Sequence, residues 1–328
     1  MDAQAATAAL VANPAPPARW TRSDVRSGFA RTDDGEQLYW RSVGPDPSVR
    51  RGARARRRSL TIVCCNGVGV STFFWKYLVE HLRDQHRVIV WDYRGHGRSS
   101  LPRDLESADL SIERNADDLV TVLDAAGVTE PVVLMGHSMG CQVILEAHHR
   151  HPERVRALVP MFGTWARPLD TFMDFRHSRT VFEHIQALAA RTDPSSRRWL
   201  KPLYASPLAF DVTRLTGLVD SYFARQTDIA RYTDHLGHMD PDVFLKMVAQ
   251  MAEHDLTDHL PNIHVPTLVL GGENDMFTPA HRSERMAELI PGAEILVLKS
   301  ASHAAIVEQP EIICLRLDRF LDERVLGA

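Results

Sequence analysis

Apolar residues along the chain occur either in short runs or in longer segments where they recur every three or four positions. Short apolar runs bounded by turn residues predict buried strands, and the longer spacing predicts amphipathic helices. Because the two kinds of segment alternate, the pattern predicts βαβ units and a mostly parallel sheet covered by helices on both faces. Strands are expected at 25–31, 36–43, 60–65, 87–91, 131–135, 157–162, 266–270 and 293–298, and helices at 73–82, 112–126, 141–149, 280–289 and 310–324.

Three segments depart from this alternation. The first two strands are joined by Asp33-Asp34-Gly35, a turn sequence that predicts an antiparallel hairpin. Residues 1–20 are rich in alanine and proline, and we expect them to form a disordered leader. Between Phe162 and Pro266 the strand pattern stops, and the intervening residues are apolar with helical spacing. We therefore expect a helical insert in the second half of the chain.

Composition and charge exclude several classes of protein. The net charge of −4 over 328 residues argues against a general nucleic-acid binder. The sequence holds no apolar run long enough for a transmembrane helix, and the leader lacks the basic start of a secretory signal. Four cysteines without metal or disulfide spacing are typical of a reducing compartment, so we expect a cytoplasmic protein. Six arginines within 50–58 indicate a solvated surface loop, or alternatively a docking patch for an anionic partner.

The strongest chemical signal is Gly136-His137-Ser138-Met139-Gly140, which directly follows the predicted strand 131–135. A G-x-S-x-G sequence between a strand and a helix predicts a nucleophile elbow, a sharp turn that exposes the serine hydroxyl. The glycines are needed because a side chain at either position would clash in so tight a turn. The start of the following helix favours developing negative charge near Ser138.

Two later turns carry the partners that a serine nucleophile needs. Asp275 follows the strand 266–270 in Gly-Gly-Glu-Asn-Asp, and His303 follows the strand 293–298 in Ser-His-x-x-x-x-Glu-x-Pro. A neutral imidazole takes the serine proton during attack, and a carboxylate orients that imidazole and stabilises its cation. Each residue alone has an ordinary structural explanation, but the three together in this order predict a catalytic triad.

On these motifs the chain resembles the α/β-hydrolase superfamily from about residue 25 to the C-terminus, apart from the middle insert. The resemblance implies an α/β-hydrolase fold with a mostly parallel eight-stranded sheet. It divides the chain into a core at 21–163 and 264–328 and a helical cap, or lid, at 164–263. It also favours Asp275 over Glu273 as the acid. The resemblance further implies that the backbone N–H groups of Val68 and Met139 form the oxyanion hole.

Another segment, Asp92-Tyr-Arg-Gly-His-Gly-Arg-Ser99, resembles the D-x-R-G-x-G-x-S sequence that is common in this superfamily. We interpret it as structural: its glycines permit a tight loop near the site, and Asp92 and Arg94 brace the turn. It lacks the lysine and hydroxyl residue of a phosphate-binding P-loop, so we expect no nucleotide there.

The resemblance implies a serine hydrolase of the carboxylesterase type, which cleaves esters through an acyl-enzyme intermediate without a cofactor or metal. The apolar insert indicates a hydrophobic small-molecule substrate, with Gly67, Trp165 and Phe172 as candidate contacts. We expect a monomer or homodimer with no nucleic-acid partner and no stable membrane insertion. The same triad would also serve C–C bond hydrolysis or acyl transfer, and a non-catalytic small-molecule receptor remains a third alternative.

Overall fold

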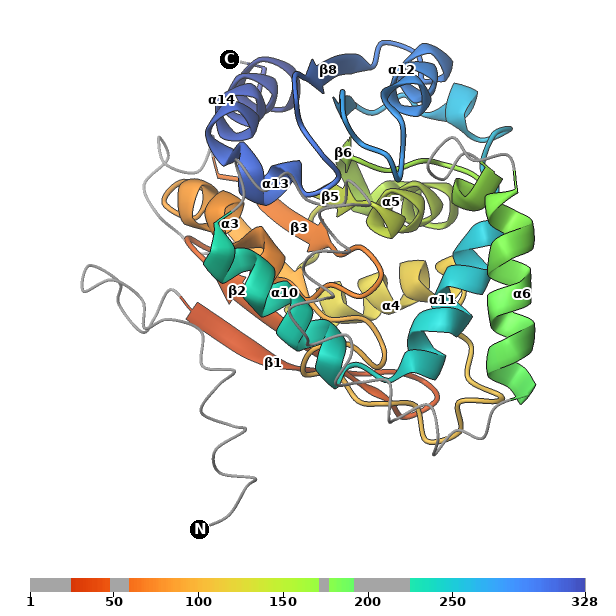
Figure 1. The fold of residues 1–328 in the computed structure, drawn as a ribbon. Coiled ribbons are helices and arrows are strands. Elements are labelled where there is room, and N and C mark those ends of the chain that lie inside the picture. Colours follow the sequence, from red (N-terminus) through yellow and green to blue (C-terminus); the bar gives the residue numbers. More distant parts are fainter. Residues whose placement is uncertain (1–24, 48–58, 171–176, 192–224, 328) are drawn as a thin grey trace.

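An open eight-stranded sheet with helices on both faces forms the core of the protein (Figure 1). The computed structural model describes residues 25–47, 59–170, 177–191 and 225–327. The strand order is β1-β2-β4-β3-β5-β6-β7-β8; β2 pairs antiparallel with β1 and β4, and all other neighbours are parallel. The strands are β1 (Val25–Arg31), β2 (Gln37–Val43), β3 (Thr61–Cys65), β4 (Arg87–Trp91), β5 (Val132–His137), β6 (Val155–Met161), β7 (Leu268–Gly272) and β8 (Glu294–Leu298).

The predicted fold is confirmed, and each predicted strand is present with its bounds shifted by no more than a few residues. Every residue of β3, β4 and β5 is buried, as parallel strands covered on both faces require. The main difference at the site is that β5 continues two residues beyond the predicted end, through His137. The strand therefore leads directly into Ser138.

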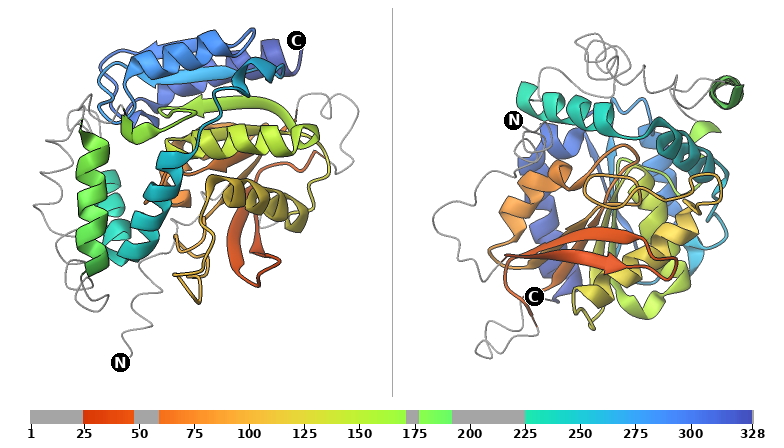
Figure 2. Two further views of the ribbon diagram at one scale, coloured as in Figure 1. Left: turned by 90° about the vertical axis from the view of Figure 1, so that its right-hand side faces the viewer. Right: turned by 90° about the horizontal axis from the view of Figure 1, so that it is seen from below.

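Two layers of helices enclose the sheet (Figure 2). Apolar side chains of α4, α5 and α12 pack on one face, and those of α3, α13 and α14 pack on the other. The helices are α3 (Lys76–Leu82), α4 (Ile112–Ala125), α5 (Met139–Arg150), α6 (Ser178–Arg191), α10 (Gln226–His238), α11 (Pro241–Glu253), α12 (Ala280–Leu289), α13 (Ala305–Glu308) and α14 (Pro310–Phe320).

Two predicted helices differ from the observed ones. The segment predicted as one helix at 73–82 begins with a 3-10 turn, Thr72–Trp75, before α3. The helix predicted at 310–324 ends at Phe320 and continues as a π-helical turn, Leu321–Val325. In both places the apolar spacing marks the buried side but does not distinguish one helical form from another, because those forms bury similar positions over a single turn.

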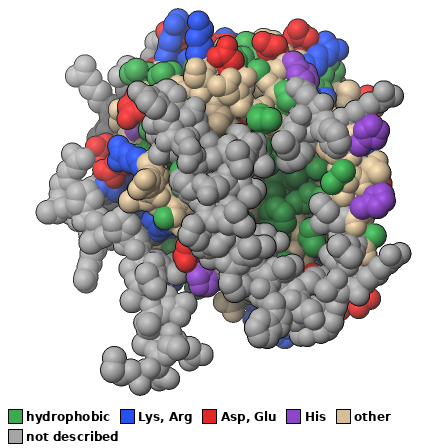
Figure 3. Space-filling view, viewed as in Figure 1, with side chains coloured by type: hydrophobic (Ala, Val, Ile, Leu, Met, Phe, Trp, Pro, Cys, Tyr) green, Lys and Arg blue, Asp and Glu red, His purple; other side chains and the backbone are tan. Residues whose placement is uncertain are grey.

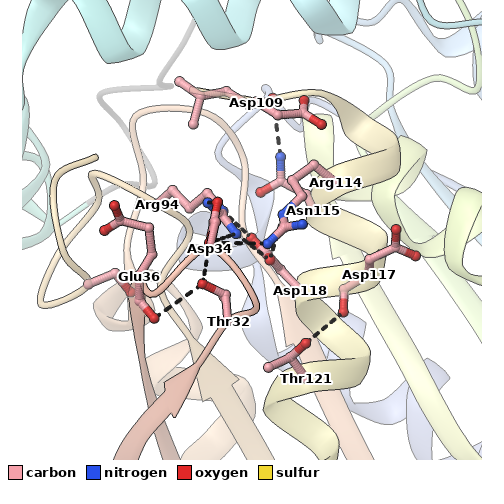
Figure 4. A network of polar contacts seen from close by, with 12 residues as sticks. Thr32, Asp34, Glu36, Arg94, Asp109, Arg114, Asn115, Asp117, Asp118 and Thr121 are labelled. Atoms are coloured by element: carbon pink, nitrogen blue, oxygen red, sulfur yellow. Dashed lines mark hydrogen bonds and ion pairs between the residues drawn. The ribbon is translucent and has the colours of Figure 1, made fainter. Parts of the chain in front are cut away.

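A buried ion network joins the β1–β2 turn to the sheet and to α4 (Figure 4). The Arg94 guanidinium donates to both carboxylate oxygens of Asp118 at 2.6 and 2.9 Å, and also contacts Asp34 of the turn. Arg94 and Asp118 are each about 1% exposed, so each neutralises the charge of the other, which would be costly to bury alone. Arg94 thus ties the β1–β2 turn to α4, whereas the sequence analysis assigned it to the turn of its own segment, Asp92–Ser99.

The helices α6, α10 and α11 belong to the segment predicted as the cap. Their side chains line one cavity together with residues that follow β3, β5, β7 and β8, so they lie over the carboxyl ends of these strands. Much of the predicted cap, the leader and the arginine run at 50–58 lie outside the described residues. The division of the chain into leader, core and cap therefore stays a prediction.

Candidate active site

Ser138 lies in the sharp turn between β5 and α5, at a backbone conformation of φ 56° and ψ −120°. Few residues other than glycine adopt this region, and such strain is typical of a nucleophile elbow. The flanking glycines allow the turn to form. A Cβ on Gly136 would lie 2.2 Å from the carbonyl oxygen of Gly140, and one on Gly140 would lie 2.2 Å from that of Cys65. The spacing of the pentapeptide therefore has a direct steric cause.

Three predicted site residues converge at this turn. His303 Nε2 lies 2.9 Å from Ser138 Oγ, and His303 Nδ1 lies 2.9 Å from Asp275 Oδ2. Because a carboxylate only accepts hydrogen bonds, His303 Nδ1 donates to Asp275 and Nε2 is left to accept the serine proton. The Asp275 side chain is fully buried and that of His303 is 7% exposed, so water competes little for these contacts.

Asp275 is held in place by its own turn. One carboxylate oxygen accepts the N–H groups of Phe277 and Thr278 at 2.9 and 2.8 Å, and the other accepts the Thr278 hydroxyl at 2.7 Å. Glu273 is exposed and accepts the Ser300 N–H instead, at 2.9 Å. Of the two acids considered from the sequence, Asp275 is the one beside the histidine.

Two side chains, those of Glu308 and His137, fix the loop that carries His303. Glu308 accepts the Ser302 hydroxyl at 2.6 Å and the Ser302 N–H at 3.2 Å, which gives the glutamate of the Ser-His-x-x-x-x-Glu motif a structural role. His137 Nε2 donates to the backbone carbonyl of His303 at 2.9 Å. Burial lowers the pKa of His137 to about 3, so it is a neutral donor at pH 7. His137 occupies the first variable position of the elbow, and its role was not predicted from the sequence.

The loop after β3 lies beside the serine, where an oxyanion would form. Val68 lines the cavity, and its N–H makes no hydrogen bond to a described residue. Met139 is the first residue of α5, so its N–H has no acceptor within the helix. The Asn66 side chain points away from the site: it donates to the Trp91 carbonyl at 2.6 Å and accepts the Trp75 indole N–H at 2.7 Å. The described geometry thus leaves both predicted donors available.

His96 is a second residue that the sequence analysis missed. Its Nε2 accepts the N–H of Gly69, in the loop after β3, at 3.1 Å, and its Nδ1 donates to the Arg94 carbonyl at 3.0 Å. Burial lowers the pKa of His96 to about 4, which keeps Nε2 free to accept. His96 occupies the variable position of Gly-x-Gly in the Asp92–Ser99 segment. That segment therefore supports the loop that carries Val68.

Ser138 and His303 open into a cavity of about 640 Å³ whose lining is mostly apolar. Hydrophobic side chains also gather in a hollow on the face seen in Figure 3. Gly67, predicted as a substrate contact, lines the cavity, and Phe172 lies outside the described residues. Apolar and aromatic lining residues include Val70, Phe73, Phe74, Leu169, Val181, Phe182, Ile229, Tyr232, Phe244, Val248, Met251, Phe277 and Val307.

The expectation for Trp165 is corrected: it is not among the residues that line the cavity. Its indole N–H donates to Thr257 at 2.9 Å, and its ring packs under the guanidinium of Arg282 at 4.2 Å. The side chain is 4% exposed within the main core cluster, so it anchors the start of the insert.

The described part of the chain shows neither a metal site nor a membrane-spanning helix. No group of three or more histidine, cysteine, aspartate or glutamate side chains there is arranged to hold a metal ion. No helix among the described residues is long and apolar enough to cross a membrane.

Comparison with known proteins agrees with the fold. A family model described as "alpha/beta hydrolase fold" matches residues 61–310. Among relatives, the "Putative carbamate hydrolase RutD" of Azorhizobium caulinodans is 30% identical over 76% of this chain and 87% of its own. The protein of that name from Pseudomonas savastanoi pv. phaseolicola is 28% identical over 76% and 88%. A thermophilic esterase from Thermogutta terrifontis superposes with a TM-score of 0.69 at 24% identity, over 92% of this chain and 99% of its own. The chain therefore belongs to the alpha/beta hydrolase fold family.

Proposed function

We propose that the protein is a serine hydrolase that cleaves carboxylic esters of a hydrophobic small molecule through an acyl-enzyme intermediate. The observation that carries this proposal is the 2.9 Å contact between Ser138 Oγ and His303 Nε2, at the wall of a large apolar cavity. Asp275 completes the arrangement on the far side of the imidazole. We assign α6, α10 and α11 to a cap that gives the cavity its apolar wall.

In the proposed mechanism, Ser138 Oγ attacks the ester carbonyl carbon while His303 Nε2 takes its proton. The carbonyl oxygen becomes an oxyanion, which accepts hydrogen bonds from the N–H groups of Val68 and Met139. The tetrahedral intermediate collapses, the C–O bond breaks, and His303 gives its proton to the leaving alkoxide. Water then repeats the sequence on the acyl-enzyme and releases the acid. Asp275 stabilises the imidazolium at each stage.

The relatives named as carbamate hydrolases make a carbamate the second candidate substrate. The same attack, collapse and hydrolysis would cleave it, with the carbamoyl group held on Ser138. The cavity favours a bulky ester over a small carbamate, because its volume of about 640 Å³ and its apolar side chains suit a bulky hydrophobic group. Both reactions use Ser138 as the nucleophile, so the serine chemistry is tested first.

The test is hydrolysis of p-nitrophenyl esters with acyl chains of increasing length. We expect Ser138-dependent turnover with an optimum at a medium or long chain, since the cavity wall is apolar. Ser138→Ala should lose activity while keeping its circular dichroism and melting temperature. Ser283→Ala is the matched control, because Ser283 is a buried serine of α12 that does not line the cavity. Turnover of carbamates but of no ester would replace the ester proposal with the second candidate.

A further inference from the structure

An aromatic ring stacks on the imidazole of His303. The ring centres of Phe277 and His303 are 5.1 Å apart, and the two ring planes meet at 26°. Both residues line the cavity, and Phe277 is half-buried. This distance and angle are those of an offset stack, in which one ring covers part of the face of the other. Phe277 therefore covers one face of the imidazole that is proposed to take the serine proton.

The turn that holds Asp275 also holds Phe277. Phe277 follows Asp275 by two positions, and its backbone N–H donates to Asp275 Oδ1 at 2.9 Å. The other carboxylate oxygen, Oδ2, accepts from His303 Nδ1 at 2.9 Å. One carboxylate thus fixes both the edge of the imidazole and the backbone that carries the stacked ring. Because the backbone makes this contact, the N–H donor is kept when the side chain at position 277 is changed.

His137 is the second ring beside His303. Its ring centre lies 5.0 Å from that of His303, and Phe74 packs on the His137 ring at 4.7 Å. Burial lowers the pKa of His137 to about 3, so this ring stays neutral over the pH range in which a histidine ordinarily titrates. The described side chains around the His303 imidazole thus include one carboxylate, that of Asp275, and two uncharged rings.

The stack on Phe277 becomes stronger when His303 is charged. Two neutral rings attract each other weakly, whereas a cation over the face of an aromatic ring is attracted by the negative charge of that face. In the proposed mechanism His303 is neutral when the substrate binds, and it is a cation while each tetrahedral intermediate forms. Because the added attraction exists only at these stages, it speeds the reaction and does not tighten substrate binding.

We propose that Phe277 is a positioning residue for the proposed triad: its ring keeps the His303 imidazole in place and stabilises the positive charge that forms on it. This role deepens the proposed function and rests on it. An aliphatic side chain would fill the same space without offering an aromatic face to the cation. The role therefore depends on the aromatic character of residue 277, whereas a wall of the cavity needs only an apolar side chain.

Fluorination of the Phe277 ring tests this role with little change of shape. The changes Phe277→4-fluorophenylalanine and Phe277→3,4,5-trifluorophenylalanine, made by codon suppression, withdraw electrons and reduce the negative charge of the ring face in steps. We expect kcat for a p-nitrophenyl ester to fall in the same steps, by about three- to tenfold for the trifluoro ring, with KM nearly unchanged. Phe29 is the matched control for the same changes, because it is exposed on β1 and does not line the cavity.

Two ordinary substitutions complete the series. Phe277→Leu removes the aromatic face and should lower kcat by about tenfold, again with KM nearly unchanged. Phe277→Tyr keeps the face and should retain most of the activity. A kcat that stays constant across the fluorinated rings would overturn the positioning role. So would a rise in KM alone in Phe277→Leu, which is the result expected of a residue that only forms a wall of the cavity.

An NMR titration of Ser138→Ala separates this proposal from the esterase proposal, because it needs no turnover. Histidines labelled with carbon-13 at Cε1 report protonation, and Ser138→Ala/His303→Gln identifies the signal of His303. With the trifluoro ring at position 277 this signal should titrate at a lower pH, since the imidazolium has lost a stabilising contact. That result supports the stack even if wild type hydrolyses no ester. An unchanged titration contradicts the stack, even if Ser138-dependent hydrolysis is observed.

Discussion

The residues proposed for catalysis come from separate turns, each after the carboxyl end of a strand. Parallel strands bring such turns to one edge of the sheet, so residues 165 positions apart, Ser138 and His303, meet at 2.9 Å. Each side chain is then fixed locally: Ser138 by its strained backbone, Asp275 by two N–H groups and a hydroxyl, and His303 by its neighbours. This preorganisation is what an apolar cavity needs at its reactive end, since its apolar walls offer few groups to solvate developing charge.

Asp275→Asn tests the carboxylate. An amide has no charge to stabilise the imidazolium, and its NH₂ group favours the wrong tautomer of His303. We expect kcat for a p-nitrophenyl ester to fall by about 10⁴-fold with the fold retained. Glu273→Gln is the control, because Glu273 is exposed and its carboxylate accepts only the Ser300 N–H among the described residues. A near-normal Asp275→Asn together with an inactive Glu273→Gln would move the role of the acid to Glu273.

His137→Leu tests the hydrogen bond that holds the histidine loop to the elbow. Loss of the Nε2 donor leaves the His303 carbonyl without this partner, and a single neutral hydrogen bond contributes about 0.5–1.5 kcal/mol. We expect kcat to fall by about tenfold with KM nearly unchanged, because His303 is less well placed while the rest of the cavity is intact. His137→Gln, which can still donate, should recover part of the loss. A rise in KM alone would contradict a positioning role.

At the scale of the elements, the loop after β4 shows how backbone geometry supports the site. Asp92 accepts the N–H groups of Thr72 and Arg98, each at 3.0 Å, so it ties this loop to the segment that precedes α3. Gly97 lies against the same carboxylate with a φ of +51°. A Cβ at this glycine would meet Asp92 Oδ2 at 2.2 Å.

Gly97→Ala should therefore destabilise the protein by more than backbone strain alone. Gly127 is the matched control: its φ is +69°, but an added Cβ there meets no atom within 4 Å. Gly127→Ala should cost about 1–2 kcal/mol in the free energy of unfolding, the usual penalty of the left-handed conformation. Gly97→Ala should cost at least about 2 kcal/mol more in denaturant titrations, because Asp92 must move. Equal costs would mean that Asp92 can move away from the added Cβ without a loss of stability.

The sequence predicted the elements and the proposed triad because both depend on local patterns. Strands, helices and the three turns each have their own sequence pattern, and the parallel sheet brings the three turns together. Contacts that join distant positions without a motif were missed: His137 with the His303 carbonyl, His96 with Gly69, and Lys76 with Asp228. Trp165 was misplaced because an aromatic residue near the start of an insert can face the core or the cavity with the same spacing. Such choices are decided by packing in three dimensions.

At the scale of the whole molecule, buried and half-buried histidines link stability to pH. Burial is the largest cause that lowers the pKa of His96 and His148 to about 4, and of His137 and His235 to about 3. An unfolded chain binds protons at these positions below pH 6.5, whereas the folded one does not. Stability is therefore present above that pH and is lost as the pH falls toward 4. Asp92 acts in the opposite direction, since burial raises its pKa to about 6.

Denaturant titrations between pH 7 and 4.5 should thus show the free energy of unfolding falling with pH. Each histidine contributes up to about 1.4 kcal/mol per pH unit. His235→Leu should reduce the slope of the free energy of unfolding against pH by the contribution of one proton. It also removes a buried Nε2 atom that has no described partner. The same change at His238, an exposed residue of α10, is the control. An unchanged slope in His235→Leu would contradict the assignment of a half-buried, neutral imidazole.

The central claim is that Ser138 is the nucleophile, and labelling with a fluorophosphonate tests it most directly. The reagent phosphonylates an activated serine and blocks it. We predict that intact mass shows one adduct on wild type, that peptide mapping places the adduct on Ser138, and that ester hydrolysis declines in proportion to labelling. Ser138→Ala should remain unlabelled and inactive. Hydrolysis that continues after Ser138 is fully labelled, or that survives in Ser138→Ala, would contradict the account.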